Sequence, residues 1–187
     1  MVTGTPDDDA LMARIASKEE AAFRLLVLRW EPQVRAFLIH MLGSVEEAED
    51  LVQDTFVQVF GRAAGYRAEG LFKSWLFRIA GNLARSRLRR RKILGWVRFE
   101  FAEHDLAAHG PGPDADLERK QEAERLHAAI ARLPGRQKEA LVLHRFQGLK
   151  YQEVAVAMGV TVPAVESLIQ RSLAFLRTAL TDEEVPR

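Results

Sequence analysis

The densest chemical signal in the sequence is a run of cations between Asn82 and Lys92. Six of these eleven residues are basic: Arg85, Arg87, Arg89, Arg90, Arg91 and Lys92. Such a density on one helix attracts phosphate groups, and it predicts nucleic-acid binding that weakens as salt is added. The alternative is a solvated helix end that the helix dipole favours, although that would not require six cations.

A loop of small residues, GRAAGYRAEG at residues 61–70, precedes this basic run. Its glycines favour mobility, and Tyr66 presents the kind of ring on which an unstacked base can stack. A tyrosine in a loop has many other uses. This signal therefore indicates nucleic acid only together with the basic run that follows it.

The stretch before the loop, AEDLVQDTFVQVF at residues 48–60, has two faces when plotted at 100° per residue. We expect one face to belong to the core: Val52, Phe56, Val59 and Phe60. The other face is acidic with interspersed glutamines: Glu49, Asp50, Gln53, Asp54 and Gln58. That composition suits contact with a basic protein surface, and the alternative is a face that is merely solvated.

Residues 151–177, YQEVAVAMGVTVPAVESLIQRSLAFLR, have the spacing of a helix-turn-helix motif. Ala155 is small enough for two helices to cross closely, and Gly159 can adopt the positive φ of the turn. Thr161 can cap the second helix, and Pro163 is tolerated in its first turn. The inner face of that helix is apolar: Val165, Leu168 and Ile169.

A helix-turn-helix places the N-terminal residues of its second helix in the major groove of DNA. We expect four side chains to face bases or phosphates: Ala164, Ser167, Gln170 and Arg171. Glu166 lies among them, where a carboxylate repels phosphates but can accept from a cytosine amino group. Upstream, Arg136 and Lys138 begin a helix from which they can reach phosphates. The alternative is a generic helical hairpin with a solvated face.

The histidines of the chain form no catalytic or metal-binding pattern. They are scattered along the sequence: His40, His104, His109, His127 and His144. No HExxH, P-loop or Gly-x-Ser-x-Gly motif is present, and the absence of cysteine excludes thiol nucleophiles and cysteine zinc sites. We therefore expect no catalysis, no metal, no cofactor and no small-molecule substrate.

Helical periodicity dominates the elements that position these residues. We expect helices at residues 8–16, 18–42, 45–61, 70–93, 117–133, 136–147, 150–158 and 162–180. Ser17 with Glu20, and Ser44 with Glu47, have capping-box spacing. Pro32 should kink or break the second helix.

The glycines and prolines of residues 109–114 cannot continue a helix and indicate a linker. The expected fold is all-α, with two small helical domains at residues 7–94 and 117–181. A flexible linker at 95–116 joins them, and the helix-turn-helix lies in the C-terminal domain. Residues 96–101 of the linker are unusually apolar and could dock on a domain or on a partner.

The composition is that of a folded protein, with 48% hydrophobic and 28% charged residues and a net charge of +1. The charges are segregated along the chain, which indicates at least two surfaces with different partners. The first residues, MVTGTPDDD, have no secretory or transit pattern, and no apolar run approaches the ~20 residues of a membrane span. Together with the lack of cysteine, this predicts a cytoplasmic protein.

Taken together, these segments resemble the extracytoplasmic-function (ECF) sigma factors, the compact two-domain group of the main bacterial sigma-factor family. The resemblance covers residues 18–92 and 118–178. AEDLVQDTFVQVF is similar to the polymerase-binding helix of that family, and FKSWLFRIAGNLARSRLRRRK to the helix that engages the melted minus-ten element. LPGRQKEALVLHRFQGLKYQEVAVAMGVTVPAVESLIQR is similar to the domain that reads the minus-thirty-five element.

The resemblance implies a non-enzymatic subunit that directs core RNA polymerase to promoters, melts DNA and starts transcription of a stress or envelope regulon. It implies that the clamp helices of the largest polymerase subunit contact Glu49, Asp50, Gln53, Asp54 and Gln58. It assigns minus-ten contacts to Tyr66, Lys73, Asn82, Arg85, Ser86, Arg89 and Arg90. It assigns minus-thirty-five contacts to Arg136, Thr161, Pro163, Ala164, Glu166, Ser167, Gln170 and Arg171. A further implied partner is an anti-sigma factor, often membrane-bound, for which residues 96–101 are a hypothetical docking point.

The chain departs from the family pattern at three positions. Ser86 stands where the family usually has an aspartate, and Glu166 and Leu168 stand where many members have basic residues. The resemblance therefore predicts the class of protein and not its promoter sequence.

The competing interpretation is a helix-turn-helix regulator that binds operator DNA without polymerase. It accounts for the C-terminal half but leaves the acidic face at 48–60 and the basic run unexplained. Such regulators usually dimerise on palindromic sites, and the sequence has no heptad or extra helix for dimerisation. Co-purification with core polymerase distinguishes the two interpretations.

Overall fold

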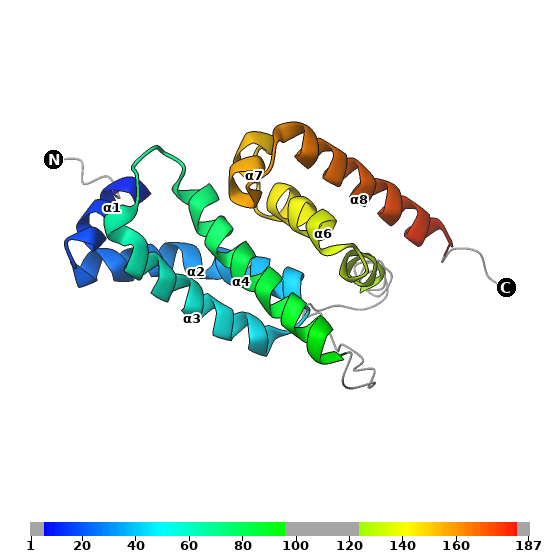
Figure 1. Cartoon of the computed structure of the whole chain (residues 1–187), viewed down its shortest axis with the longest axis horizontal. Helices are drawn as coiled ribbons and strands as arrows, with labels where there is room; N and C mark the ends of the chain where they lie inside the picture. The colour runs from blue at the N-terminus through cyan, green and yellow to red at the C-terminus, as the bar shows by residue number, and fades with distance from the viewer. Residues whose placement is uncertain (1–5, 96–123, 183–187) are drawn as a thin grey trace, which may run out of the picture.

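The computed structural model describes residues 6–95 and 124–182, and all regular structure in these ranges is helical (Figure 1). The N-terminal module consists of α1 (Asp8–Ala16), α2 (Glu20–Leu42), α3 (Val45–Arg62), the short η1 (Ala63–Gly65) and α4 (Phe72–Gly95). The C-terminal module consists of helical residues 124–131, α6 (Gly135–Leu141), η2 (Val142–Phe146), α7 (Tyr151–Met158) and α8 (Val162–Asp182). The expected all-α fold is confirmed, whereas residues 96–116 of the expected linker lie outside the described residues.

Aromatic side chains form the centre of the N-terminal module. Phe37 on α2 and Phe77 on α4 are fully buried, and their ring centroids lie 5.3 Å apart. Trp30 on α2 packs its ring against Phe77 and against Phe72 at the start of α4. These contacts hold α2 and α4 together, so the other faces of α4 are left for different neighbours.

The helix caps predicted at Ser17 and Ser44 can be compared with the observed ends of the helices. Ser44 Oγ accepts a hydrogen bond from the backbone N–H of Glu47 at 3.3 Å, which confirms the Ser44 half of the predicted capping box of α3, whereas the Glu47 carboxylate pairs with Arg91. The predicted capping box from Ser17 is wrong, because Ser17 ends α1 and Glu19 occupies the N-cap of α2. Lys18 has a left-handed φ of 64° between the two helices, and this tight turn assigns Ser17 to the earlier one.

Pro32 lies inside α2, which continues through it from Glu20 to Leu42. Of the predicted kink or break, the break is therefore wrong. A proline removes one backbone donor from a helix, but Trp30 and Val34 on either side are buried in the core and hold the helix in place.

The C-terminal module contains the predicted helix-turn-helix. α7 and α8 meet at 100°. Gly159 ends α7 with a φ of 64°, a conformation that glycine adopts without steric cost. Ala155 is only 6% exposed where the helices cross, and Val165 and Ile169 are buried behind them. In the described ranges no single helix is long and apolar enough to cross a membrane; only this bent pair, taken together, has the required length and composition.

The two modules pack against each other, and we call this the closed arrangement. α4 contacts α7, and α2 contacts η2 (Figure 1). One hydrophobic cluster runs through both modules and includes Phe77 and Ala84 of α4 together with Leu143 and Val154 of the C-terminal module. One face of α4 is therefore covered by the module that contains the helix-turn-helix.

Candidate functional site

The cations of the basic run divide into two groups. Arg91 Nε lies 3.0 Å and Arg87 Nη1 lies 3.6 Å from Oε1 of Glu47 on α3. Arg91 Nη1 also donates to the carbonyl oxygen of Leu42 at 3.0 Å. These two cations hold α4 to the start of α3, and neither belongs to the residues assigned to the minus-ten element. The exposed cations of the run are Arg89, Arg90 and Lys92.

Arg85 contacts the C-terminal module. It forms an ion pair with Glu139 on α6, whose side chain is fully buried. Burial raises the pKa of Glu139, while the charges of Arg85 and Arg136 act in the opposite direction. Gly81 makes room for this carboxylate, because a Cβ at that position would lie 2.6 Å from Glu139 Oε1. Arg85 also donates to Oδ1 of Asn82, so two predicted minus-ten residues have partners within the chain.

Lys73, near the start of α4, is engaged by the same module. Its Nζ donates to the carbonyl oxygen of Gln147 at 2.5 Å. The predicted minus-ten surface and the interface between the modules therefore overlap at Lys73 and Arg85. Ser86 is half-buried, and three of the predicted residues remain exposed: Asn82, Arg89 and Arg90.

Tyr66 lies in the loop that joins η1 to α4, and its side chain is half-buried. Its ring centroid is 5.0 Å from that of Trp75 and 5.9 Å from that of Phe72, both in edge-on geometry. Its hydroxyl donates to Oδ1 of Asp9 on α1 at 2.5 Å. Contacts from two helices thus fix the ring, and its remaining surface is the candidate stacking site for a base.

The acidic face of α3 points away from the core. Asp50, Gln53 and Asp54 are exposed, and Gln58 is half-buried. Glu49 is also exposed and forms an ion pair with Arg35 of α2 at 2.8 Å. All five predicted polymerase-binding residues are therefore on one helix, with most of their side chains accessible.

Two apolar side chains were not assigned to this surface from the sequence. Val57 is 70% exposed and Phe60 is 46% exposed. Phe60 was expected in the core, and that prediction is wrong: its ring packs edge-on against Phe23 at the rim of the module, with centroids 5.2 Å apart. Val57 follows Gln53 by four residues, so helical spacing alone could have placed it on the acidic face. Exposed apolar side chains beside polar ones are typical of protein interfaces.

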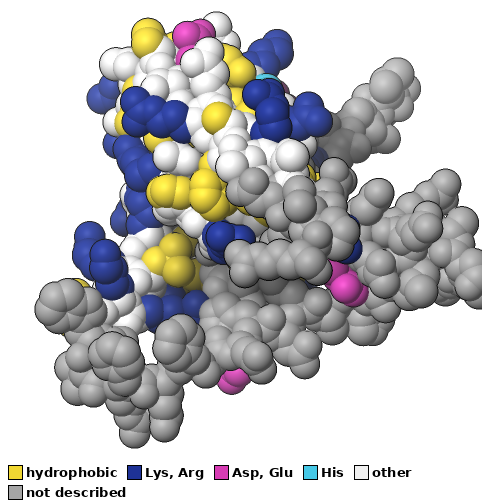
Figure 2. Space-filling model, turned by 90° about the vertical axis from the view of Figure 1, so that its right-hand side faces the viewer, with side chains coloured by type: hydrophobic (Ala, Val, Ile, Leu, Met, Phe, Trp, Pro, Cys, Tyr) yellow, Lys and Arg dark blue, Asp and Glu magenta, His cyan; other side chains and the backbone are white. Residues whose placement is uncertain are grey.

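The first turns of α8 present the predicted recognition residues. Thr161, Pro163, Glu166, Gln170 and Arg171 are exposed, and Ala164 and Ser167 are half-buried. Figure 2 shows Lys and Arg side chains along one edge of the molecule, with few acidic side chains among the coloured residues of the face in view. A surface of this kind suits a polyanion.

The two basic residues at the start of α6 have different surroundings. Arg136 is exposed, whereas Lys138 is only 9% exposed, and burial lowers its pKa. In the closed arrangement Lys138 is therefore neither available to phosphates nor solvated, the two possibilities that the sequence left open for it. Sequence reasoning also missed Ser172, which is buried with its Oγ 2.7 Å from the Leu168 carbonyl oxygen and 3.1 Å from that of Gln137. It joins α8 to α6, and a single serine in a helix gives no signal for such a role.

The histidines in the described residues make packing contacts. The ring centroid of His40 lies 4.5 Å from that of Phe146 and 5.9 Å from that of His127. The ring centroid of His144 lies 4.8 Å from that of Tyr151. Within residues 6–95 and 124–182, no three His, Asp or Glu side chains are placed to hold a metal ion. His104 and His109 lie outside these ranges.

Two family models match the chain, one in each module. The model described as Sigma-70 region 2 matches residues 26–93, and the model described as Sigma-70, region 4 matches residues 123–176. The first match contains α3, the Tyr66 loop and most of α4. The second contains the helix-turn-helix.

Whole-chain comparisons give similar proteins. The RNA polymerase sigma factor NccH of Alcaligenes xylosoxydans xylosoxydans is 30% identical over 95% of this chain and 97% of its own length. The ECF RNA polymerase sigma-E factor of Haemophilus influenzae is 32% identical over 88% of this chain and 90% of its own. Among solved structures, the sigma factor RpoE from Bartonella quintana, in complex with the anti-sigma factor NepR, has a TM-score of 0.71 and 26% identity. That similarity covers 85% of this chain and 96% of the RpoE chain.

Proposed function

This chain belongs to the sigma-70 family and, within it, to the extracytoplasmic-function group, and we propose how its two modules divide the work of a sigma factor. As an RNA polymerase sigma factor, it binds core polymerase and directs promoter recognition, DNA melting and the start of transcription. We assign polymerase and minus-ten binding to residues 7–94, the linker to 95–116 and minus-thirty-five binding to 117–181. In this assignment the chain contributes recognition and no catalysis of its own, and it acts in the cytoplasm.

The polymerase-binding surface is the outer face of α3. The observation that most supports it is that this helix exposes carboxylates, glutamines and the apolar side chain of Val57 on one side, while its other side is core. Carboxylates of this kind suit a basic partner, and an apolar residue among them adds area that becomes buried on contact. The proposed contacts are Glu49, Asp50, Gln53, Asp54, Val57 and Gln58.

The minus-ten surface consists of the Tyr66 loop and the outward side of α4. Extruding a base from the duplex costs a few kcal/mol, which stacking on an aromatic ring and contacts to the backbone can offset. Asn82, Arg89 and Arg90 are already exposed for this role. Lys73, Arg85 and Ser86 would join them once the C-terminal module moves away.

The minus-thirty-five surface is the exposed start of α8, supported by Arg136 on α6. The proposed contacts are Arg136, Thr161, Pro163, Ala164, Glu166, Ser167, Gln170 and Arg171. Arg171 and Arg136 are suited to phosphates, whereas Gln170 and Ser167 can pair with base edges. The turn at Gly159 sets the angle at which α8 meets the groove.

A closed chain cannot read both promoter elements at once. The two elements lie roughly 25 base pairs apart, which is roughly 80 Å along duplex DNA at about 3.4 Å per base pair. In the closed arrangement α4 and α7 are in contact. We therefore propose that the modules separate when the chain binds polymerase and that the linker spans the gap.

We also propose an anti-sigma protein as a regulatory partner, in some settings bound to the membrane. The support is the fold similarity to RpoE, which was solved with the anti-sigma factor NepR. Residues 96–101 are retained as a hypothetical docking point for such a partner. Replacing Trp96 and Phe99 with serine tests this docking point. An unchanged affinity for the anti-sigma protein would show that these residues do not bind it.

The proposed polymerase surface is tested by binding of the full chain to purified core polymerase. Asp54→Arg should weaken binding by about tenfold or more, because it places a cation against a basic partner. Val57→Ser should weaken it by a smaller factor without changing stability, since the side chain is 70% exposed. Leu173→Ser is the matched control, because Leu173 is an exposed apolar residue of α8 in the other module. Wild-type affinity in both α3 variants would contradict the assignment, and binding of duplex DNA without core would favour an independent regulator.

A further inference from the structure

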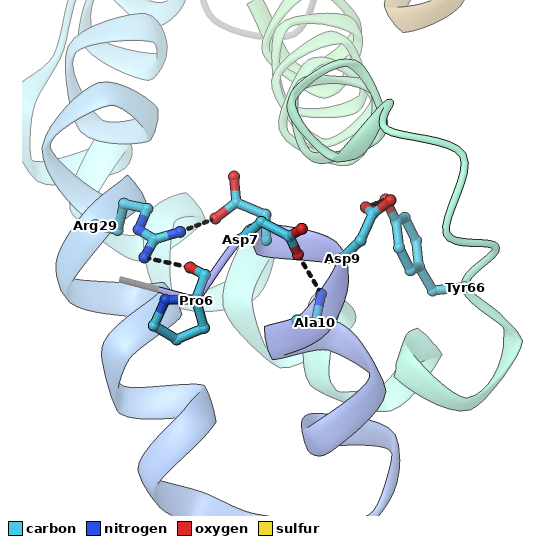
Figure 3. A network of polar contacts seen from close by, with 7 residues as sticks. Pro6, Asp7, Asp9, Ala10, Arg29 and Tyr66 are labelled. Carbon is cyan, nitrogen blue, oxygen red and sulfur yellow. Dashed lines mark hydrogen bonds and ion pairs between the residues drawn. The ribbon is translucent and has the colours of Figure 1, made fainter. Parts of the chain in front are cut away.

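The loop that contains Tyr66 is tied to α1 by a single carboxylate. Asp9 Oδ1 accepts the hydrogen bond from the Tyr66 hydroxyl at 2.5 Å, and Asp9 Oδ2 accepts one from the backbone N–H of Gly70 at 2.8 Å. Figure 3 shows the side chains of Asp9 and Tyr66 meeting between α1 and the loop. One side chain thus binds both ends of the segment 66–70, from a position 57 residues earlier in the chain than Tyr66.

The start of α1 is itself fixed so that Asp9 faces this loop. Asp7 Oδ1 accepts a hydrogen bond from Ala10 N at 2.7 Å and caps the helix. Asp8 forms an ion pair with Arg29 of α2 at 2.6 Å. Arg29 also donates to the carbonyl oxygen of Pro6 at 2.9 Å, as Figure 3 shows. Each of the three aspartates therefore has a separate polar partner, and among their hydrogen bonds and ion pairs in the described residues only those of Asp9 reach the loop.

Apart from the bonds to Asp9, the described loop has two local backbone hydrogen bonds, from Tyr66 N–H to the Ala63 carbonyl oxygen at 3.1 Å and from Glu69 N–H to the Arg67 carbonyl oxygen at 3.0 Å. Arg67, Ala68, Glu69 and Gly70 are exposed, and a Cβ at Gly70 would meet no atom within 4 Å. Gly70 adopts a φ of 68°, a conformation that glycine supplies without strain. The ring of Tyr66 touches Phe72 and Trp75 only edge-on. The two bonds to Asp9 are therefore a main restraint on the shape of segment 66–70.

The Tyr66 hydroxyl stays protonated, so it remains the donor of the hydrogen bond to Asp9. Burial, with the neighbouring Asp9 carboxylate, raises the pKa of Tyr66 well above its ordinary value. The phenol is then a donor throughout the neutral range, and Asp9 is its acceptor. A hydrogen bond to a charged group is stronger than a neutral one.

We propose that Asp9 is a positioning residue for the promoter base captured at the Tyr66 loop: its two carboxylate oxygens hold Tyr66 and Gly70 in the shape that receives the base. This inference rests on the proposed minus-ten function of the loop and extends it to a helix that the region 2 match, beginning at residue 26, does not include. A loop that is shaped before binding loses less conformational entropy when the base enters.

Simple electrostatics predicts the opposite effect, which makes the proposal easy to test. Removing a negative charge near DNA should strengthen binding, because fewer phosphates are repelled. If Asp9 instead shapes the loop, removing it should weaken capture of the base although the charge becomes more favourable. The sign of the change therefore separates the two roles.

The experiment measures fluorescence anisotropy of labelled single-stranded DNA with holoenzyme, formed from core polymerase and the full chain. The probe is the non-template strand across the minus-ten element of a promoter that the wild-type holoenzyme selects from a random library. A second set of probes has one abasic site at each position in turn. The wild type should bind the intact strand about tenfold more tightly than the abasic strand that lacks the captured base.

Asp9→Ala should raise the Kd for the intact strand by about tenfold, leave the Kd for that abasic strand unchanged or slightly lower and leave core binding unchanged. Tyr66→Phe keeps the ring but loses the donor, so it should reproduce part of this loss. The loss in the double variant should be smaller than the sum of the two single losses, because both remove the same hydrogen bond. Asp9→Asn retains one acceptor oxygen and should fall between wild type and Asp9→Ala.

Glu20→Ala is the matched control, since it removes a charge of the same sign from an exposed side chain of α2 that pairs with Arg24 and has no part in holding α1 or the loop. It should retain the preference for the intact strand. If the wild type prefers the intact strand and Asp9→Ala binds it as tightly or more tightly, the positioning role is wrong while the loop function stands. If the wild-type holoenzyme itself has no preference for an intact strand, the proposed base capture and the role of Asp9 are both wrong.

Discussion

Arg89 and Arg91 lie two residues apart on α4 and have different surroundings. Arg91 binds the carboxylate of Glu47 and the carbonyl oxygen of Leu42, both in the N-terminal module. Arg89 is exposed. At the scale of the residue, a cation with two fixed partners contributes to stability, whereas an exposed one is available to an external phosphate.

This difference predicts separate effects of the same substitution. Arg91→Gln should lower the free energy of unfolding by about 1–2 kcal/mol, and Arg89→Gln should change it by less than about 0.5 kcal/mol. Arg89→Gln should instead weaken promoter binding by the holoenzyme. It should also make the negative slope of the logarithm of the binding constant against the logarithm of salt concentration shallower by about 0.9. Urea unfolding and a salt series of promoter binding measure the two quantities. Equal loss of stability in both variants would show that the two cations have the same role.

At the scale of the element, the helix-turn-helix depends on one backbone conformation. Gly159 has a φ of 64° where α7 ends, and α8 begins three residues later. A residue with a Cβ is strained in that left-handed region by about 1–2 kcal/mol. The angle between α7 and α8 is therefore coupled to the identity of residue 159.

Gly159→Ala should lower the free energy of unfolding of the C-terminal module by about 1–2 kcal/mol and weaken minus-thirty-five binding. Gly135→Ala is the control, because a Cβ there meets nothing within 4 Å and its φ is not in the left-handed region. It should be neutral or slightly stabilising. Thermal unfolding and binding to duplex DNA are measured for both variants. Equal stability and equal DNA affinity of the two variants would contradict the role of the turn.

Elements of this chain could be predicted from the sequence because their signals are local. The bounds of α1 agree with the expected 8–16, and the turn at Gly159 with the buried Val165 follows from spacing alone. Ser17 shows the limit of such signals, since its spacing fits a cap but the turn at Lys18 assigns it to the previous helix. Phe60 shows another limit, because the position where a helix leaves the core depends on its neighbours.

The site residues also differ in whether a local sequence signal or a distant neighbour determines their surroundings. The exposed acidic face of α3 could be predicted from a helical wheel. The partners of Arg87, Arg91 and Lys138 could not, since Glu47 lies 44 residues from Arg91 and the burial of Lys138 depends on how helices pack. Asp9 had no signal of its own, because its role appears only when α1 lies beside the Tyr66 loop.

At the scale of the whole molecule, the closed arrangement places two of the proposed minus-ten residues against the C-terminal module. Arg85 binds the buried carboxylate of Glu139, and Lys73 binds the Gln147 carbonyl oxygen. No local pattern in the sequence encodes this contact, because the same cations are equally suited to DNA. In our proposal, opening the modules exchanges these internal partners for phosphates.

Gly81→Ala should shift the chain toward the open form. Alanine favours the helical state of α4 by about 1 kcal/mol over glycine, but its Cβ would lie 2.6 Å from Glu139 Oε1 in the closed arrangement. The N-terminal module should therefore stay folded while the contact between modules weakens. Energy transfer between dyes at Arg62→Cys and Arg177→Cys reports the separation, since the chain has no other cysteine. Unchanged transfer in Gly81→Ala would contradict the close fit of Glu139 at this glycine.

The most direct test of the sigma-factor assignment is run-off transcription with purified core polymerase. The wild-type chain should give promoter-specific transcripts. Asp54→Arg should lose them together with core binding, whereas Arg89→Glu should bind core and lose them at promoter opening. A wild-type chain that neither binds core nor starts transcripts, while it still binds duplex DNA tightly, would contradict the account.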